Sequence, residues 1–222
     1  IQVSLLETAP RILQRVTAPE LSDFYTRIHQ EQGVSIYNNI TIERFIGATQ
    51  VEGILCTDGK TIPADLVIVG IGVQPNSELV QAAGIDVDNG IVIDAYGRTN
   101  DPDIVAAGDC TSHFNHHYQR QIRLESVPNA NEQAKVAAAT LCGKFKPYDT
   151  LPWFWSDQYD IKLQIAGLNH GYDQLVIRGD LQNSKSFVAF YFKNKQLIAA
   201  DCINRPLEFM ISKSIINDNI QI

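Results

Sequence analysis

Apolar and polar residues follow patterns that divide the first part of the chain into strands and helices. Residues 1–7 alternate with the period of two that is typical of a strand, and Glu7 stands at the carboxyl end. Leu21 and Ile28 recur at helical spacing after Pro19, and proline is common in a first helical turn. The elements predicted here are a strand at 1–7, helices at 10–16 and 19–32, and strands at 34–37, 40–46, 49–56 and 61–62.

Two nearly continuous apolar runs predict strands that are buried in the interior. Residues 65–70, DLVIVG, are expected to form a strand covered on both faces. Residues 103–108, DIVAAG, are expected to form a second strand that closes in a turn of small residues at 106–109. Small residues let the backbone come close to a ligand, and a carboxylate beyond a strand accepts hydrogen bonds from sugar hydroxyls. The stretch 91–110, which contains this turn, is therefore where we expect a cofactor.

The second part of the chain predicts a helical region followed by an antiparallel unit. Its first elements are helices at 77–83 and 130–141, a strand at 91–94, a polar loop at 111–123 and an aromatic, proline-rich connector at 147–155. Strands at 161–166, 174–178, 187–192 and 196–202 and a helix at 207–216 follow. Strand, helix, strand, meander and buried strand is the order of the second part of a dinucleotide-binding domain, and the last segment is typical of a small α+β unit.

Composition narrows the classes of function. The 222 residues carry a formal net charge of −7, which argues against nucleic acid as the main partner. No apolar run reaches the length of about 18 residues that a membrane span needs. The four cysteines form no C-x-x-C pair, so free thiols in a cytoplasmic protein are expected rather than a dithiol centre or a zinc knuckle. The chain opens directly on an apolar alternating run, which predicts that the sequence begins inside a domain.

Charged and glycine residues of the first part suggest a nucleotide site and also have simpler explanations. Glu7 can bind both adenosine ribose hydroxyls, which favours NAD over NADP, or it can be a solvated loop carboxylate. Arg11 and Arg15 can accept a 2′-phosphate, stack on adenine or lie on a helix surface. Gly70 and Gly72 permit close approach of a flat ligand or simply a turn. The glycine-rich turn expected about 20 residues before the acidic strand end is not in the chain.

The polar loop and the aromatic connector also leave alternatives open. The loop carries His113, His116, His117, Arg120 and Arg123. We expect no metal site there, because no cysteine or carboxylate stands nearby at ligand spacing. A solvated loop and a basic rim that steers an acidic protein partner are the two remaining interpretations. The two tryptophans of the connector either pack in a core or lie against a flat cofactor on an electron-transfer surface.

Three motifs in this order resemble those of a known enzyme family. They are T-x-x-P-x-[IV]-x-A-x-G-D at 99–109, R-x-E-S-V-P-N-A-x-E-Q at 123–133 and L-P-W-F-W-S-D-Q at 151–158. Together they resemble FAD-dependent, NADH-using ferredoxin reductases of the putidaredoxin reductase type, which serve cytochrome P450 and ring-hydroxylating oxygenase systems. The resemblance implies an α/β fold with incomplete Rossmann-like FAD- and NAD-binding domains, followed by a small α+β carboxyl-terminal domain. It also implies that the chain is a carboxyl-terminal fragment.

The resemblance carries a domain division and a set of site residues. The domains implied are the latter part of an NAD-binding domain at 1–75, a returning FAD segment at 76–146 and a reductase or dimerisation-like domain at 147–222. Electrons would pass from NADH through FAD to a [2Fe-2S] ferredoxin, and no catalytic side chain is implied. The implied FAD and nicotinamide contacts are Gly108, Asp109, Glu125, Ser126, Val127 and Trp155. The implied NAD contacts are Glu7, Thr8 and Arg15 by the adenosine and Gly72 by the nicotinamide.

Two other functions remain open on the sequence. The chain can be a non-catalytic module that mediates protein contact. It can also be a relative of rubredoxin reductase, monodehydroascorbate reductase or apoptosis-inducing factor. We expect neither a membrane nor a nucleic acid as partner, and homodimerisation is left open.

Overall fold

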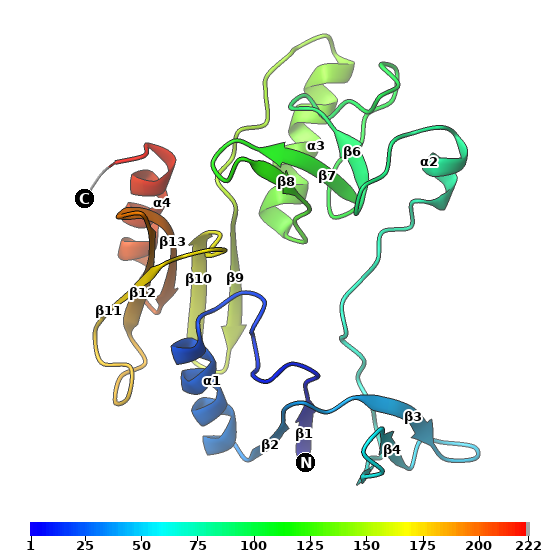
Figure 1. The fold of residues 1–222 in the computed structure, drawn as a ribbon, viewed down its shortest axis with the longest axis vertical. Coiled ribbons are helices and arrows are strands. Elements are labelled where there is room, and N and C mark those ends of the chain that lie inside the picture. The colour runs from blue at the N-terminus through cyan, green and yellow to red at the C-terminus, as the bar shows by residue number, and fades with distance from the viewer. Residues whose placement is uncertain (221–222) are drawn as a thin grey trace. The chain divides into compact units, whose positions relative to one another are not determined.

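The computed structural model describes residues 1–220, and the chain divides into two compact units (Figure 1). The first unit is Ile1–Gly72 and the second is Val73–Ile222. The fold has the predicted classes of element, with incomplete α/β domains first and a small α+β domain last. No helix in the described part of the chain is both long and apolar enough to cross a membrane.

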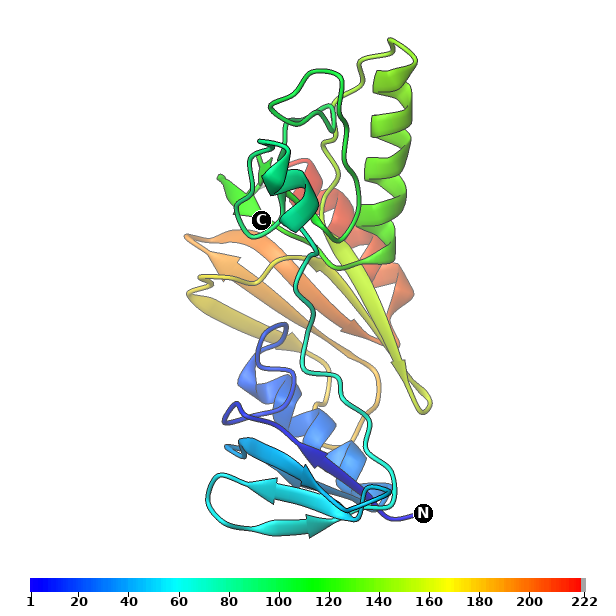
Figure 2. The ribbon, with the colours of Figure 1, turned by 90° about the vertical axis from the view of Figure 1, so that its right-hand side faces the viewer.

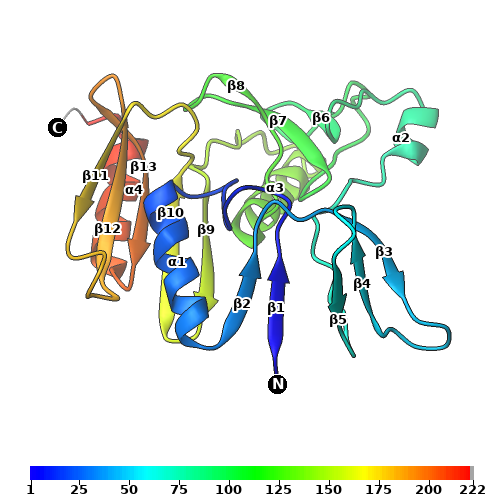
Figure 3. The same cartoon turned by 60° about the horizontal axis from the view of Figure 1, so that its bottom comes forward.

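The first unit begins with a strand, helix and strand whose two strands pair in parallel. Strands β1 (Val3–Leu6) and β2 (Val34–Tyr37) lie side by side (Figure 3), with Val3 opposite Val34. Helix α1 (Pro19–Glu31) connects them and buries the predicted apolar stripe. Residues 10–16 form turns rather than the predicted helix, because Leu13 takes a positive φ of 56° that interrupts helical geometry.

An antiparallel meander completes the first unit. It consists of β3 (Ile42–Ile46), β4 (Gly53–Cys56) and β5 (Thr61–Pro63). Ile54, Cys56 and Ile62 form its small core, against which Leu6 and Tyr37 pack. These strands follow the predicted ones with shorter bounds.

The apolar run at 65–70 is not the buried strand that the sequence predicts. Leu66 is 78% exposed and Ile68 is 88% exposed, and residues 66–70 pair with no strand of the described chain. A strand of a parallel sheet is stabilised by hydrogen-bonded neighbours and by cover on both faces. The described residues supply neither for this run, so it stays extended and unpaired.

The second unit begins with a short helix, a three-stranded sheet and a long helix. These are α2 (Glu78–Ala82), β6 (Ile91–Ile93), β7 (Thr111–Asn115), β8 (Arg120–Ile122) and α3 (Val127–Leu141). The predicted strand at 103–108 is wrong, since it holds a single isolated bridge from Val105 to Arg98. The predicted loop at 111–123 is instead the hairpin β7–β8. Pattern reading missed β7 because polar side chains point inward there, and Gln133 of α3 forms hydrogen bonds with two of them, Thr111 and His113.

A five-stranded antiparallel sheet and one helix end the second unit. The strand order is β11-β12-β13-β10-β9, formed by Gln174–Arg178, Phe187–Lys193, Gln196–Ile203, Ile161–Gly167 and Trp153–Gln158. Helix α4 (Pro206–Asn217) packs on one face of this sheet (Figure 2, red). Strand β9 occupies part of the predicted connector, because its residues alternate between half-buried and exposed along the sheet edge.

One tyrosine joins the hairpin β7–β8 to this sheet. Tyr118 Oη donates to the carbonyl oxygen of Ile198 at 2.9 Å and accepts from the Leu168 N–H at 2.6 Å. Gly167 beside it has φ +76°, and a Cβ there would lie 2.6 Å from Tyr118 Oη. Burial raises the pKa of Tyr118, so the hydroxyl stays protonated and can donate.

Candidate functional site

The turn at Gly108 and Asp109 presents a carboxylate that forms no bond within residues 1–220. Gly108 has φ +91°, a conformation that favours glycine. Asp109 is exposed, and among residues 1–220 its carboxylate has no hydrogen bond or ion pair. Only its backbone is engaged, since the Asp109 carbonyl oxygen accepts from Arg123 Nη1 at 3.2 Å. The carboxylate is therefore available to accept hydrogen bonds from a ligand.

Helix α3 holds this turn through a buried glutamine. Gln133 is 2% exposed, and its Oε1 accepts from the Gly108 N–H at 2.8 Å. Thr111 Oγ1 lies 2.8 Å from Gln133 Oε1 and 2.8 Å from the Gly108 carbonyl oxygen, so its proton serves one of the two. Asn129 Nδ2 lies 3.4 Å from the same Oε1. Gln133 thus fixes the backbone from which Asp109 projects.

A neutral histidine and a tyrosine complete the support under the turn. The amide nitrogen of Gln133 faces His113 Nδ1 at 3.2 Å, so it donates there and the imidazole proton lies on Nε2. Burial lowers the pKa of His113 to about 4 and raises that of Tyr148 to about 12, which keeps both groups uncharged. The two rings meet edge to face at 5.1 Å, and Tyr148 Oη donates to Asn129 Oδ1 at 2.8 Å.

For His113, this arrangement contradicts both interpretations drawn from the sequence, the solvated loop and the basic rim. His113 is 3% exposed, so it belongs neither to a solvated loop nor to a basic rim. Nowhere in the described part of the chain do three or more His, Cys, Asp or Glu residues gather in a way that could hold a metal. His117 Nε2 lies 3.9 Å from Asp149 Oδ1, and its side chain is 13% exposed.

The start of α3 places three more of the predicted residues beside one another. Ser126 is the N-cap, and its hydroxyl accepts from the Asn129 N–H at 3.3 Å. Val127 follows at the first helical position and is 59% exposed. Glu125 forms an ion pair with Arg123 Nη1 at 2.7 Å. Because Arg123 also binds the Asp109 carbonyl, one guanidinium ties the Asp109 turn to the start of α3.

Sequence reasoning missed the parts played by Gln133 and Arg123. Arg123 is the first residue of the motif at 123–133 and Gln133 is the last. Their place in this motif was the one feature of the sequence that could have indicated a role. The sequence left Arg123 either in a solvated loop or on a basic rim, but its side chain is only 11% exposed and its bonds are internal.

Trp155 is a half-exposed indole on the edge strand β9. It is 43% exposed, and its ring centroid lies 5.7 Å from that of Trp153 at an interplanar angle of 31°. Trp153 packs on the core cluster under α4, while α3 lies next to β9. Each of the two interpretations drawn from the sequence therefore fits one tryptophan. Trp153 packs in the core, and Trp155 faces outward.

The residues predicted for NAD lie in the first unit. Glu7 follows β1, and its Oε1 accepts from the Ala9 N–H at 2.9 Å and from Thr8 Oγ1 at 3.3 Å. Its Oε2 makes no bond within the described chain and remains available to a ligand. Arg15 is exposed, and its Nη1 lies 3.7 Å from where a Cβ on Gly72, whose φ is +97°, would stand.

Arg11, the other arginine of this region, has a structural role. Its Nη1 donates to the Thr17 carbonyl oxygen at 2.9 Å and to Ser22 Oγ at 2.6 Å. These bonds hold the turns before α1, so Arg15 is the arginine that remains available to a ligand.

The donor sets of both regions fit the cofactors that the sequence implies. Asp109 offers an uncommitted carboxylate on a positive-φ glycine turn, and Glu7 offers one uncommitted oxygen at a strand end. Carboxylate oxygens in these positions accept hydrogen bonds from ribityl and ribose hydroxyls. FAD at the first region and NAD at the second are therefore chemically compatible with the residues present.

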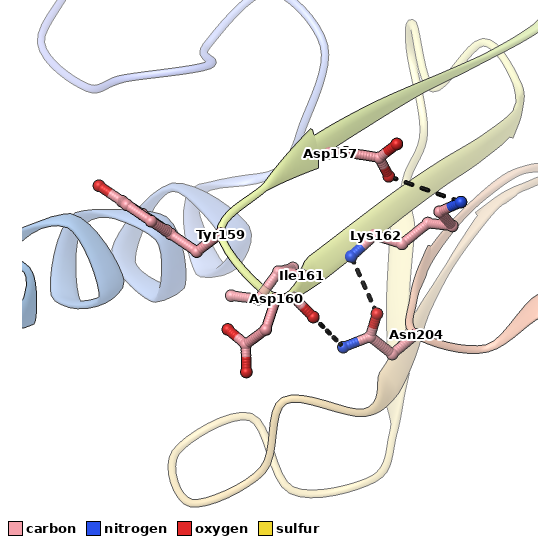
Figure 4. Close-up of a pocket in the computed structure, with 6 residues that line it drawn as sticks. All are labelled: Asp157, Tyr159, Asp160, Ile161, Lys162 and Asn204. Carbon is pink, nitrogen blue, oxygen red and sulfur yellow. Dashed lines mark hydrogen bonds and ion pairs between the residues drawn. The ribbon is translucent and has the colours of Figure 1, made fainter.

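A surface cavity lies elsewhere, at the hairpin between β9 and β10 (Figure 4). It has a volume of about 410 Å³ and is lined by Asp157, Tyr159, Asp160, Ile161, Lys162 and Asn204. Its charges are paired within the chain, Lys162 with Asp157 at 3.8 Å and Asp160 with Lys185 at 2.9 Å. None of the predicted cofactor residues lines it.

Comparisons with known proteins identify two families along the chain. The family described as pyridine nucleotide-disulphide oxidoreductase matches residues 1–134. The family described as reductase C-terminal matches residues 153–222.

Individual relatives match 91% or more of the chain but only about half of their own length. Putidaredoxin reductase CamA of Pseudomonas putida is 48% identical over 225 residues, covering 100% of this chain and 53% of that protein. The anthranilate 1,2-dioxygenase system ferredoxin–NAD(+) reductase component of Burkholderia cepacia is 43% identical over 203 residues, covering 91% of this chain and 50% of that protein. The covalent putidaredoxin reductase–putidaredoxin complex matches with a TM-score of 0.95 at 48% identity, covering 100% of this chain and 54% of the solved one. The chain thus spans about half the length of these relatives.

Proposed function

We propose, on the premise that this chain belongs to the pyridine nucleotide-disulphide oxidoreductase family, that it forms the carboxyl-terminal part of an NADH-dependent, FAD-containing ferredoxin reductase. The acceptor is a [2Fe-2S] ferredoxin of a cytochrome P450 or ring-hydroxylating oxygenase system. A relative named as a putidaredoxin reductase, at 48% identity, and one named as the ferredoxin–NAD(+) reductase component of an anthranilate 1,2-dioxygenase system, at 43%, support this.

The proposal gives each predicted residue a task at its cofactor. FAD, when bound, takes two electrons from NADH and releases them singly to a one-electron carrier. Asp109 accepts hydrogen bonds from the ribityl and pyrophosphate region, on a backbone whose close approach Gly108 permits. Ser126 caps α3 and Val127 offers backbone to the ring, while Glu125 lies by the nicotinamide and Trp155 by the flavin and the ferredoxin surface. No side chain has to act as acid, base or nucleophile.

The residues of the first unit bind the other cofactor in this proposal. Glu7 holds the adenosine ribose through its uncommitted oxygen, with Thr8 and Arg15 near the adenosine. Gly72 lines the nicotinamide side, where its positive φ leaves room for a flat ring. The glutamate favours NADH over NADPH because it would repel a 2′-phosphate.

We also propose the domain division and the location. The domains are an NAD-binding part at 1–75, a returning FAD segment at 76–146 and a reductase domain at 147–222. The gap between the two family matches, after residue 134 and before residue 153, supports the second boundary. Four free cysteines support a cytoplasmic location, since reducing compartments keep thiols unpaired.

The observation that carries the proposal is the unbonded Asp109 carboxylate on a turn that α3 fixes through Gln133. A chimera tests it, in which this chain follows the amino-terminal half of the Pseudomonas putida relative. We expect a yellow protein with flavin absorbance that reduces putidaredoxin with NADH. The amino-terminal half alone and the unaltered relative are the negative and positive controls.

Two other outcomes would point to different functions. A colourless, folded chimera would contradict the proposal and favour a protein-interaction module. A yellow chimera that reduces rubredoxin but no [2Fe-2S] protein would favour the second candidate, which a rubredoxin–NAD(+) reductase at 36% identity supports.

A further inference from the structure

A lysine on α4 carries a positive charge that no carboxylate of residues 1–220 neutralises. Among the residues that the structure describes, the Lys213 ammonium takes part in no ion pair or hydrogen bond. It lies instead over two rings, with Nζ 4.7 Å from the centroid of Trp153 and 5.5 Å from that of Phe209. Lys213 is half-buried, and burial lowers its pKa, which indicates that the ammonium has lost part of its hydration.

The rings beneath this cation form a continuous row that ends at the surface. Phe209 lies 5.6 Å from Trp153, and Trp153 lies 5.7 Å from Trp155. Phe209 is 4% exposed and belongs to the core between α4 and the sheet, whereas Trp155 is 43% exposed. The row therefore connects a fixed core residue to an indole on the edge strand β9.

The exposed indole needs such a support to keep one orientation. Trp155 is 43% exposed on the edge strand β9, and a partly exposed ring has fewer packing contacts than the several neighbours of a core residue. The face of tryptophan attracts cations more strongly than that of other aromatic residues, most of all where the cation is partly desolvated. The Lys213 ammonium over the face of Trp153 thus holds the ring that Trp155 contacts.

We propose that Lys213 is a positioning residue for Trp155, acting through the ring of Trp153. The ammonium fixes Trp153 by a cation–π contact, and Trp153 fixes the exposed indole by ring contact. The use of that indole beside a flavin rests on the function proposed above, but the positioning itself does not.

The chain offers a direct optical test, because Trp153 and Trp155 are its only two tryptophans. Two indoles at this separation couple as oscillators and give an exciton couplet in circular dichroism that depends on their mutual angle. Lys213→Met keeps the methylene chain and removes the charge, Lys213→Gln is a second neutral variant, and Lys213→Arg keeps a cation. Lys135→Met, an exposed lysine on helix α3, is the matched control.

The expected results separate charge from packing. Loss of the cation–π contact lowers the ratio of stacked to displaced indole by about five-fold. Both neutral variants then show a weaker couplet and stronger acrylamide quenching of tryptophan emission. Lys213→Arg and Lys135→Met keep the wild-type couplet and quenching.

Two outcomes would overturn the proposal. One is a neutral, folded variant that keeps the wild-type couplet, and the other is an arginine variant that loses it as fully as the neutral ones. The assay contains no cofactor, so its failure is distinct from a failure of the chimera to bind flavin.

Discussion

Two carboxylates of the candidate sites differ in how far the chain itself engages them. Within the described part of the chain Asp109 forms bonds through its backbone only, so its side chain is available to a ligand. Glu7 already accepts two bonds at Oε1 from its own loop. Replacing Asp109 should therefore affect ligand binding alone, whereas replacing Glu7 also loosens the turn that follows β1.

Asp109→Ala in the chimera should weaken FAD retention by about 10- to 100-fold, the worth of one or two charge-assisted hydrogen bonds. Flavin absorbance after desalting and a titration of the stripped protein with FAD measure the loss. Asp86→Ala, an exposed aspartate of the same unit, serves as the control and should keep its flavin. An Asp109→Ala protein with wild-type FAD affinity would contradict the assignment.

Glu7→Ala should raise the KM for NADH by about ten-fold and leave kcat nearly unchanged, because a ribose contact persists from ground state to transition state. Steady-state kinetics of the chimera with putidaredoxin in excess measure both constants. Unchanged NADH kinetics would show that Glu7 is only a loop carboxylate.

At the scale of elements, the sequence predicted those helices and strands whose apolar residues recur with a regular period. Helix α1, strand β2 and strand β11 lie within one residue of their predicted ends, because each has a clean apolar period and a clear stop. Strand β7 was not predicted, because the side chains that it buries include the polar residues Thr111, His113 and Asn115. Burial of Thr111 and His113 depends on Gln133, which lies far along the chain and which no local pattern connects to them.

Gln133→Leu should destabilise the second unit by about 2–4 kcal/mol, because the Gly108 N–H loses its acceptor and His113 Nδ1 loses its donor together. Urea unfolding followed by far-ultraviolet circular dichroism measures the change. Asn131→Leu, an exposed position on the same helix, is the control and should change stability little. Equal stability of the two variants would rule out the network as the support of the turn.

Strands β12 and β13 bury a carboxyl group whose titration should be visible in stability. Asp201 is fully buried and accepts from the Tyr191 hydroxyl, and burial raises the pKa of its carboxyl to about 7. The folded state then keeps the proton while the unfolded state has lost it. The contribution of Asp201 to the free energy of unfolding is therefore greatest below the pKa of the unfolded state. It falls as pH rises towards 7, by up to about 1.4 kcal/mol per pH unit.

Asp201→Asn cannot ionise and should remove this slope. Chemical unfolding at a series of pH values between 4 and 8 compares it with the wild-type chain, in steps on the order of one unit. The variant should gain relative stability as pH rises. Parallel curves for the two proteins would mean that Asp201 keeps an ordinary titration in the folded state.

At the scale of the whole molecule, the exposed apolar run at 65–71 sets the behaviour of the chain in isolation. Leu66, Ile68 and Ile71 are 78%, 88% and 86% exposed, and contiguous apolar surface of this kind binds hydrophobic dyes and promotes association. No pattern in the sequence distinguishes such an exposed run from a buried strand, because the difference depends on neighbours.

The double variant Leu66→Lys, Ile68→Lys should lower the ANS fluorescence of the isolated chain by about half. Leu79→Lys, an equally exposed but solitary leucine, should lower it little. Light scattering on the same samples should show less association in the double variant only. An unchanged ANS signal would place the dye-binding surface elsewhere.

The contact between Tyr118 and Gly167 has a consequence for engineering by exchange of domains. The hydroxyl belongs to the hairpin of one family match, while both backbone groups that it bonds belong to the other. A graft of the last 70 residues onto a different reductase would bring the glycine and leave the tyrosine behind. Only a crossover point before the hairpin transfers both Tyr118 and Gly167. The crossover should therefore lie before Thr111, well inside the first family match.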